Sequence, residues 1–200
     1  MKVIGLTGGI ASGKSTVSSM LKKFGAIIID VDEIARKVVS KGEIAYNKII
    51  ESYGREILLS NGEINRKKLG SIVFSDKGKL ELLNKITHPE IIESVKKEIE
   101  LLRDQGCKVA VVDAAILIEM GLNKYVDYVW LVVVDKETQI QRLIERDRLT
   151  SLEALNRINS QFTNQQRMDY ADVIIDNNKP IEEVEDIVTN LWNNISRGDS

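Results

Sequence analysis

Five short apolar segments recur along this chain, and longer stretches with helical spacing of apolar residues lie between them. The segments contain many β-branched residues and are apolar at consecutive positions, which is typical of strands covered on both faces. Alternation of such strands with helices predicts an α/β fold with a doubly wound parallel sheet. The predicted strands are residues 3–7, 26–29, 109–112, 129–134 and 173–175.

A complete phosphate-binding loop lies between the first predicted strand and a helical pattern at 16–24. Residues 8–15 read GGIASGKS and match the motif G-x-x-x-x-G-K-S/T. The glycines let backbone N–H groups surround an anion, and the helix N-terminus adds the positive end of its dipole. Lys14 then reaches the β- and γ-phosphates, and the Ser15 hydroxyl binds Mg²⁺. The candidate ATP-binding residues here are Gly9, Ile10, Ala11, Ser12, Gly13, Lys14, Ser15 and Thr16.

The gap between the second and third predicted strands is larger than a parallel crossover requires. About 75 residues separate them, whereas a single helix completes a crossover. Asn65 is a candidate helix cap, and the His88–Pro89 step predicts a break between two helices. The predicted helices are 33–41, 44–53, 66–74, 77–87 and 90–105. We expect this insertion to form a helical lobe that holds a phosphate acceptor.

A second helical addition follows the fourth predicted strand. Residues 137–147 and 151–167 have helical spacing, with a break near 148–150, and Thr150 and Glu153 have the spacing of a capping box. Arg142 and Arg146 lie four residues apart, hence on one helix face. By themselves they suit a solvated, salt-bridged pair of helices. After a strand of a phosphate-binding sheet they favour a lid that closes over phosphates. A last helix is predicted over 181–195.

Carboxylates follow two predicted strands at the end where an open α/β sheet forms its ligand crevice. Asp30 and Asp32 follow the second strand, and residues two apart in an extended chain point to the same side. Asp32 is the candidate base for a hydroxyl acceptor, with Asp30 in reserve; alternatively, Asp32 caps the following helix. Asp113 follows the third strand and looks like a Walker B aspartate. Asp113 and Glu119 are candidates for the waters around Mg²⁺, and equally for caps or surface groups.

Composition narrows the remaining classes. The chain has 200 residues, 43% hydrophobic content and two prolines, which favours a compact soluble protein. A net charge of −2 gives no broad basic field, so we expect no nucleic-acid partner. No apolar run approaches the length of a membrane span, and the single cysteine, Cys107, suits a reduced structural residue. These features predict a cytoplasmic protein without a membrane partner.

The motifs together resemble the dephospho-CoA kinase family, which catalyses the last step of coenzyme A synthesis. The resemblance runs nearly end to end. Its most specific parts are residues 30–36 (DVDEIAR) and 171–177 (ADVIIDN), because a phosphate loop alone occurs in many unrelated proteins. It also includes the segments 4–10, 88–89, 116–119 and 142–147.

The resemblance implies a P-loop kinase fold, with a five-stranded parallel sheet flanked by helices, a helical acceptor-binding insertion and a helical lid. We accordingly expect a nucleotide-binding core of residues 1–32, 107–136 and 168–200, an acceptor domain at 33–106 and a lid at 137–167. The implied reaction transfers the γ-phosphate of ATP, with Mg²⁺, to the ribose 3′-hydroxyl of dephospho-CoA. We expect a monomer or a weak homo-oligomer.

The resemblance also implies roles for single residues. Asp32 matches the family's proposed base, and His88 matches a position near the acceptor. Asn177 falls where the loop after the last strand approaches adenine. The residues that match stabilisers of phosphate charge are Lys14, Arg142 and Arg146.

Two positions depart from the family pattern. Ala11 stands where glycine is usual, and Ala115 stands where proline is usual. Neither change removes a chemical group, but a requirement for positive φ at Ala11 would be unfavourable.

Two other functions remain open at this point. One is another P-loop nucleoside or nucleotide kinase, and the other is a nucleotide-dependent regulatory switch or assembly protein. The chain has no Asn-Lys-x-Asp guanine motif, which argues against a GTPase.

Overall fold

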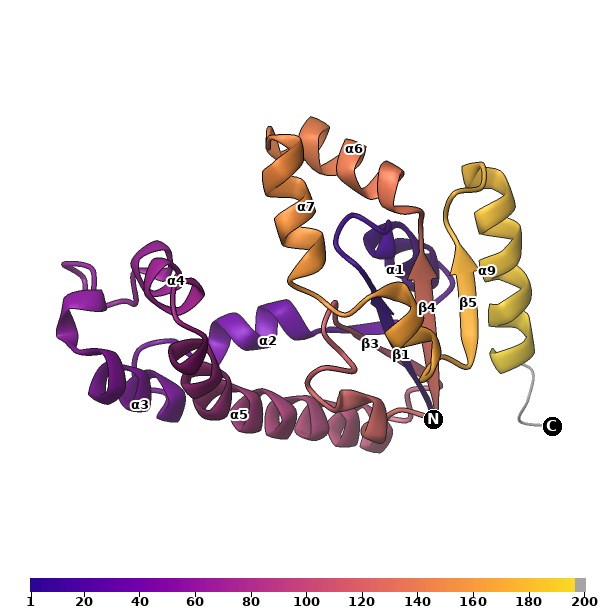
Figure 1. The fold of residues 1–200 in the computed structure, drawn as a ribbon. Helices are drawn as coiled ribbons and strands as arrows, with labels where there is room; N and C mark the ends of the chain where they lie inside the picture. Colours follow the sequence, from indigo (N-terminus) through magenta and orange to yellow (C-terminus); the bar gives the residue numbers. More distant parts are fainter. Residues whose placement is uncertain (197–200) are drawn as a thin grey trace. The chain divides into compact units, whose positions relative to one another are not determined.

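The computed structural model describes residues 1–196 and contains the predicted five-stranded sheet (Figure 1). The strand order is β2-β3-β1-β4-β5; β1 pairs in parallel with β3 and β4, and β4 with β5. The strands are β1 (Lys2–Gly8), β2 (Ile27–Asp30), β3 (Val109–Asp113), β4 (Tyr128–Val133) and β5 (Val173–Asp176). All five predicted strands are therefore confirmed, with small shifts at their ends.

The chain forms two compact units. The first contains Met1–Ile29 and the chain from Ile99 onward, and the second contains Asp30–Glu98. In the first unit, α1 (Lys14–Lys23) and α9 (Ile181–Ser196) pack on the sheet, with Val17, Leu21 and Val184 fully buried in one core with Trp130. Within residues 1–196, none of the helices combines the length and the apolar character needed to cross a bilayer.

A helical hairpin follows the carboxyl end of β4 (Figure 1). It consists of α6 (Lys136–Asp147) and α7 (Ser151–Asn159), and α7 begins with the predicted capping box of Thr150 and Glu153. The prediction of one helix over 151–167 is wrong, because α7 ends at Asn159 and a separate α8 (Asn164–Met168) follows. Thr163 and Gln166 form a second capping box, which satisfies backbone N–H groups at a new helix start.

The second unit is helical and has a core of its own, which includes Ile49, Ile57 and Val73. Its helices are α2 (Val31–Lys37), α3 (Ile44–Tyr53), α4 (Arg66–Phe74) and most of α5 (Lys77–Asp104). This unit also contains the 3₁₀ turn η1 (Arg55–Ile57). A second 3₁₀ turn, η2 (Leu122–Tyr125), precedes β4 in the first unit. The predictions for α3, for α4 and for its Asn65 cap are confirmed. The prediction for α2 is shifted, because Asp30 accepts a hydrogen bond from Glu33 N at 3.0 Å and so caps a helix that begins at Val31.

The predicted break at His88–Pro89 is wrong, since α5 continues through Pro89. Proline removes a single N–H from the helix ladder, and its restriction on the preceding residue is a bias that tertiary packing overrides. Apolar side chains on both sides of the proline, Ile86, Ile91 and Val95, are buried. Their burial stabilises the continuous helix against the local preference.

Candidate active site

The phosphate loop joins β1 to α1 and is shaped by glycine at its end. Gly13 has φ 90°, in the left-handed region, and a Cβ there would lie 1.9 Å from Asn177 Nδ2. That amide donates to the Ser12 carbonyl at 2.7 Å. Glycine is therefore required at residue 13 for both its conformation and the close approach of Asn177.

Ala11 adopts φ 59° in the same loop, so the position where this chain departs from the family pattern does require positive φ. The left-handed region costs an L-residue with a Cβ roughly 1–2 kcal/mol. Such a conformation persists only where surrounding contacts hold it. The chain therefore carries local backbone strain within its phosphate loop.

Ala11→Gly should relieve this strain. We expect an increase of about 0.5–1 kcal/mol in the free energy of unfolding, since the gain in φ freedom exceeds the extra entropy cost of glycine. Urea unfolding measures the change. Ala35→Gly, within helix α2, is the control, and it should destabilise by about 1 kcal/mol. A destabilised Ala11→Gly protein would show that the left-handed geometry is not strained in solution.

A cavity of about 680 Å³ opens beside the loop, a volume within the range of small-molecule sites. One wall consists of loop and α1 residues, among them Ser15 and Thr16. Arg142 and Arg146 of α6 line another part of the cavity, and Asn177, after β5, lines a third. The structure thus brings together residues predicted separately from the loop, the lid and the last strand.

Lys14 and Asp113 form an ion pair at the carboxyl ends of β1 and β3. Both side chains are largely buried, at 18% and 13% exposure. The Asp113 carboxylate therefore holds the Lys14 amine at the loop, and it lies beside the loop itself.

The two lid arginines make different contacts. Arg142 donates to the Ala11 carbonyl at 3.1 Å and to the Asn177 carbonyl at 3.3 Å, so it joins two walls of the cavity. Arg146 donates from Nε and Nη2 to the two oxygens of Asp147 at 2.8 and 3.0 Å, and Arg157 also contacts that carboxylate. Its hydrogen bonds with Arg146 lower the pKa of Asp147. The pairing in turn raises the pKa of Arg146.

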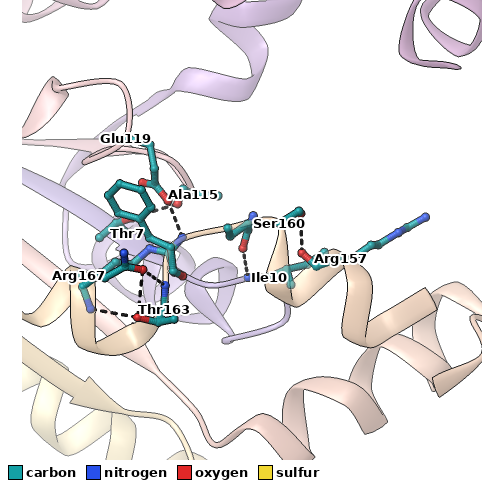
Figure 2. Close-up of polar contacts among 11 residues, drawn as sticks. Thr7, Ile10, Ala115, Glu119, Arg157, Ser160, Thr163 and Arg167 are labelled. Carbon is teal, nitrogen blue, oxygen red and sulfur yellow. Dashed lines mark hydrogen bonds and ion pairs between the residues drawn. The ribbon is translucent and has the colours of Figure 1, made fainter. Parts of the chain in front are cut away.

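Sequence reasoning did not predict the contacts of a set of polar side chains at the base of the α6–α7 hairpin, where α6 begins and α7 ends. Arg167 is 1% exposed and donates to Glu119 Oε1 at 2.7 Å (Figure 2). It also contacts the Phe162 carbonyl. Glu119 is therefore engaged with an arginine. Gln139 and Gln161 bind the phosphate loop at Ile10. Glutamine has no chemical signature in a single sequence, so these contacts could not be predicted from pattern.

Asp32 and His88 belong to the second unit, whereas the phosphate loop belongs to the first. The prediction that Asp30 and Asp32 share one side of an extended chain is wrong, because Asp30 caps α2 and Asp32 lies in its first turn. Asp32 is exposed. His88 lies within α5, where burial lowers its pKa below the ordinary value of 6.5 and favours the neutral ring.

The residues at the phosphate loop provide some, but not all, of the ligands that a magnesium ion needs. Among residues 1–196, no group of three or more His, Cys, Asp or Glu side chains is arranged to hold a metal. Mg²⁺ typically takes few protein ligands and completes its shell with water and substrate phosphates. Ser15 lines the cavity and Asp113 lies beside Lys14, so a hydroxyl and a carboxylate of the types that Mg²⁺ uses are present at the loop.

The protein has a P-loop kinase fold. A phosphate loop connects β1 to α1 in a parallel sheet, and a helical hairpin carries arginines to the cavity beside that loop. Shikimate kinase from Bacteroides thetaiotaomicron shares this fold, with a TM-score of 0.53 at 12% identity over 96% of this chain and 98% of that one.

The chain belongs to the dephospho-CoA kinase family, whose model matches residues 2–183. A dephospho-CoA kinase from Geobacter sulfurreducens is 45% identical over 192 residues, which cover 96% of this chain and 98% of that protein. The structure of dephospho-CoA kinase from Campylobacter jejuni has a TM-score of 0.76 at 27% identity and covers 100% of both chains.

Proposed function

We propose that this protein transfers the γ-phosphoryl group of ATP to the ribose 3′-hydroxyl of dephospho-CoA and so produces coenzyme A. Family membership along nearly the whole chain carries the proposal. The cavity beside the phosphate loop supports it, because loop, α6 and the segment after β5 together bound a space suited to a nucleotide. We assign nucleotide binding to the parallel core.

In this proposal the phosphates of ATP bind in the loop segment from Gly9 to Thr16. Lys14 and the lid arginines, Arg142 and Arg146, offset negative charge on the transferring group. Asn177 lies at the cavity wall proposed for adenine. Ser15 would hold Mg²⁺, with Asp113 nearby; the ion supplies charge neutralisation at the β- and γ-phosphates.

We assign the acceptor to the helical segment 33–106 and the lid to 137–167. Asp32 is the proposed base that accepts the proton of the ribose hydroxyl as the new O–P bond forms, and His88 is a proposed contact of the acceptor. The position of Asp32 in the segment DVDEIAR supports its role. We further propose a monomer or weak homo-oligomer that acts in the cytoplasm and has no nucleic-acid partner.

A coupled assay of ADP formation tests the proposed substrate. Purified protein with ATP and Mg²⁺ should produce ADP when dephospho-CoA is added, and mass spectrometry should find the acceptor heavier by one phosphoryl group. Adenosine and AMP are the rival acceptors, and a no-acceptor reaction measures ATP hydrolysis. Faster turnover with adenosine or AMP would favour a nucleoside or nucleotide kinase, and ATP turnover independent of any acceptor would favour a switch.

The lid arginines should differ when each is replaced with alanine. Arg146→Ala should lower kcat by about 10–10²-fold with little change in the KM for ATP, because a charge on the transferring group matters most in the transition state. Arg142→Ala should also raise the KM for ATP, because Arg142 binds carbonyls of Ala11 and Asn177 in the cavity wall. Steady-state kinetics measure both effects.

Lys136→Ala, at an exposed position at the start of the same helix, is the control and should retain wild-type kinetics. Limited proteolysis adds a second measurement: cleavage within residues 137–167 should slow when both substrates are bound. Equal cleavage with and without substrates would contradict a lid that closes.

A further inference from the structure

The hairpin base holds the phosphate loop from two sides at one residue, Ile10. The Ile10 N–H donates to Gln161 Oε1 at 2.9 Å, and the Ile10 carbonyl accepts from Gln139 Nε2 at 2.8 Å. Gln139 lies in the first turns of α6, and Gln161 lies in the short segment between α7 and α8. The two glutamines therefore reach Ile10 from the two arms at the base of the α6–α7 hairpin, one where α6 begins and one just after α7 ends.

The contacts at Ile10 are part of a continuous set along the loop. The Ala11 carbonyl accepts from Arg142, and the Ser12 carbonyl accepts from Asn177. Side chains from outside the loop thus hold three consecutive residues, and the middle one has the strained φ of 59°. Gly9 belongs to the same arrangement, because a Cβ there would lie 2.8 Å from Gln139 Nε2.

The segment that carries Gln161 is itself fixed by a buried ion pair. Arg167 binds the carbonyl of Phe162, the next residue after Gln161, and bonds to Glu119 in the segment after β3 (Figure 2). Glu119 follows β3 in the chain, and the Thr7 hydroxyl of β1 donates to Ala115 O in the same segment at 3.2 Å. The Gln161 amide is therefore anchored to the sheet through Arg167 and Glu119.

We infer that Gln161 and Gln139 are positioning residues: they set the backbone of the phosphate loop at Ile10, and they do so from the two arms at the base of the hairpin. The inference rests on the proposed kinase function for its kinetic part. The Ile10 N–H is itself engaged by Gln161, so its contact orients the loop residues that follow. A phosphate cradle made of their backbone N–H groups works only when those groups point at the anion, and small misplacements reduce turnover strongly. A loop held at a strained residue depends on such external contacts.

Gln161→Met is the main test, because methionine matches the length of glutamine and has no oxygen to accept the Ile10 N–H. We expect kcat to fall about 10-fold, because the loss of one hydrogen bond that stabilises the transition state has about this effect. The KM for ATP should change less. Gln161→Glu retains an acceptor oxygen and should restore protection at Ile10. Gln165→Met, at an exposed position of α8, is the control and should retain wild-type kcat.

Amide hydrogen exchange at Ile10 gives a measurement that does not depend on the reaction. In nucleotide-free protein, Gln161→Met should accelerate exchange of the Ile10 amide at least several-fold, whereas Gln165→Met should leave it unchanged. If Gln161→Met does not fold, Gln139→Met replaces it: this buried position accepts methionine, and the variant should lower kcat through the lost bond to the Ile10 carbonyl.

Wild-type kcat together with unchanged Ile10 exchange in Gln161→Met would overturn the inference. So would equal losses of kcat in Gln161→Met and Gln165→Met, since this would indicate a general effect of substitution. If the wild-type protein does not phosphorylate dephospho-CoA, the proposed function fails, but accelerated Ile10 exchange would still establish the anchoring of the loop.

Discussion

Replacing Lys14 with alanine should lower kcat by about 10²-fold or more, with a smaller loss of ATP affinity. The backbone N–H groups of the loop remain in this variant and continue to bind phosphate. The lost group is a point charge, and its value increases as negative charge develops on the transferring phosphoryl group. Steady-state kinetics with saturating dephospho-CoA, and ATP binding by calorimetry, separate the two effects.

The ion pair with Asp113 adds a second variant to this experiment. Lys14→Ala leaves the Asp113 carboxylate without its lysine beside the loop, which would repel phosphate and raise the KM for ATP. Lys14→Ala with Asp113→Asn removes that repulsion, so the KM for ATP should be lower than in Lys14→Ala alone while kcat stays low. Lys23→Ala, exposed at the other end of α1, is the control. Turnover of Lys14→Ala near the wild-type value would contradict a role for Lys14 in charge stabilisation.

The strands were predictable because their signal is local. A strand covered on both faces is apolar at consecutive positions, and residues such as Ile4, Val111 and Leu131 are fully buried. The phosphate loop was predictable for a similar reason, since its residues are contiguous and its geometry depends on glycine at fixed spacing. The sequence also indicated that Ala11 would be unfavourable if its position required positive φ. Ala11 does adopt positive φ in the structure.

The errors in the prediction came from competition between local and tertiary effects. Proline at residue 89 predicts a helix break, but burial of neighbouring apolar side chains maintains α5. The spacing of Asp30 and Asp32 predicted an extended segment. Instead, the Asp30 side chain caps α2, which begins at the next residue, Val31. The end of α7 depended on the capping box of Thr163 and Gln166, which competes with helix continuation.

The contacts of the hairpin with the loop lay beyond prediction because they join residues far apart in the chain. Gln161 and Ile10 are 151 positions apart, and Arg142 and Ala11 are 131 apart. The arginine spacing predicted a phosphate-facing lid, but not that Arg142 binds backbone carbonyls while Arg146 pairs with Asp147. Only the folded arrangement distinguishes two arginines that share one helix face.

Asp32→Asn should produce a large loss of activity with little loss of stability. Asparagine keeps the size of the side chain but lacks basicity, and the ribose hydroxyl is a poor nucleophile whose proton must leave as the O–P bond forms. We expect kcat to fall by about 10²–10⁴-fold, the usual contribution of a positioned base. A largely dissociative transfer would place the loss at the low end of this range, because proton removal then comes late.

The control for this variant is Asp30→Asn, which tests the neighbouring carboxylate and retains a helix cap, because asparagine caps helices about as well as aspartate. It should keep most of the wild-type kcat.

In Asp32→Asn, loss of one negative charge in the first turn of α2 should cost about 0.3–1 kcal/mol of stability, and ATP binding should be unchanged. If Asp32→Asn retains more than about a third of the wild-type kcat while chemistry limits turnover, the base is either Asp30 or absent. A large loss in Asp30→Asn would then identify Asp30, and high activity in both variants would establish transfer without a carboxylate base.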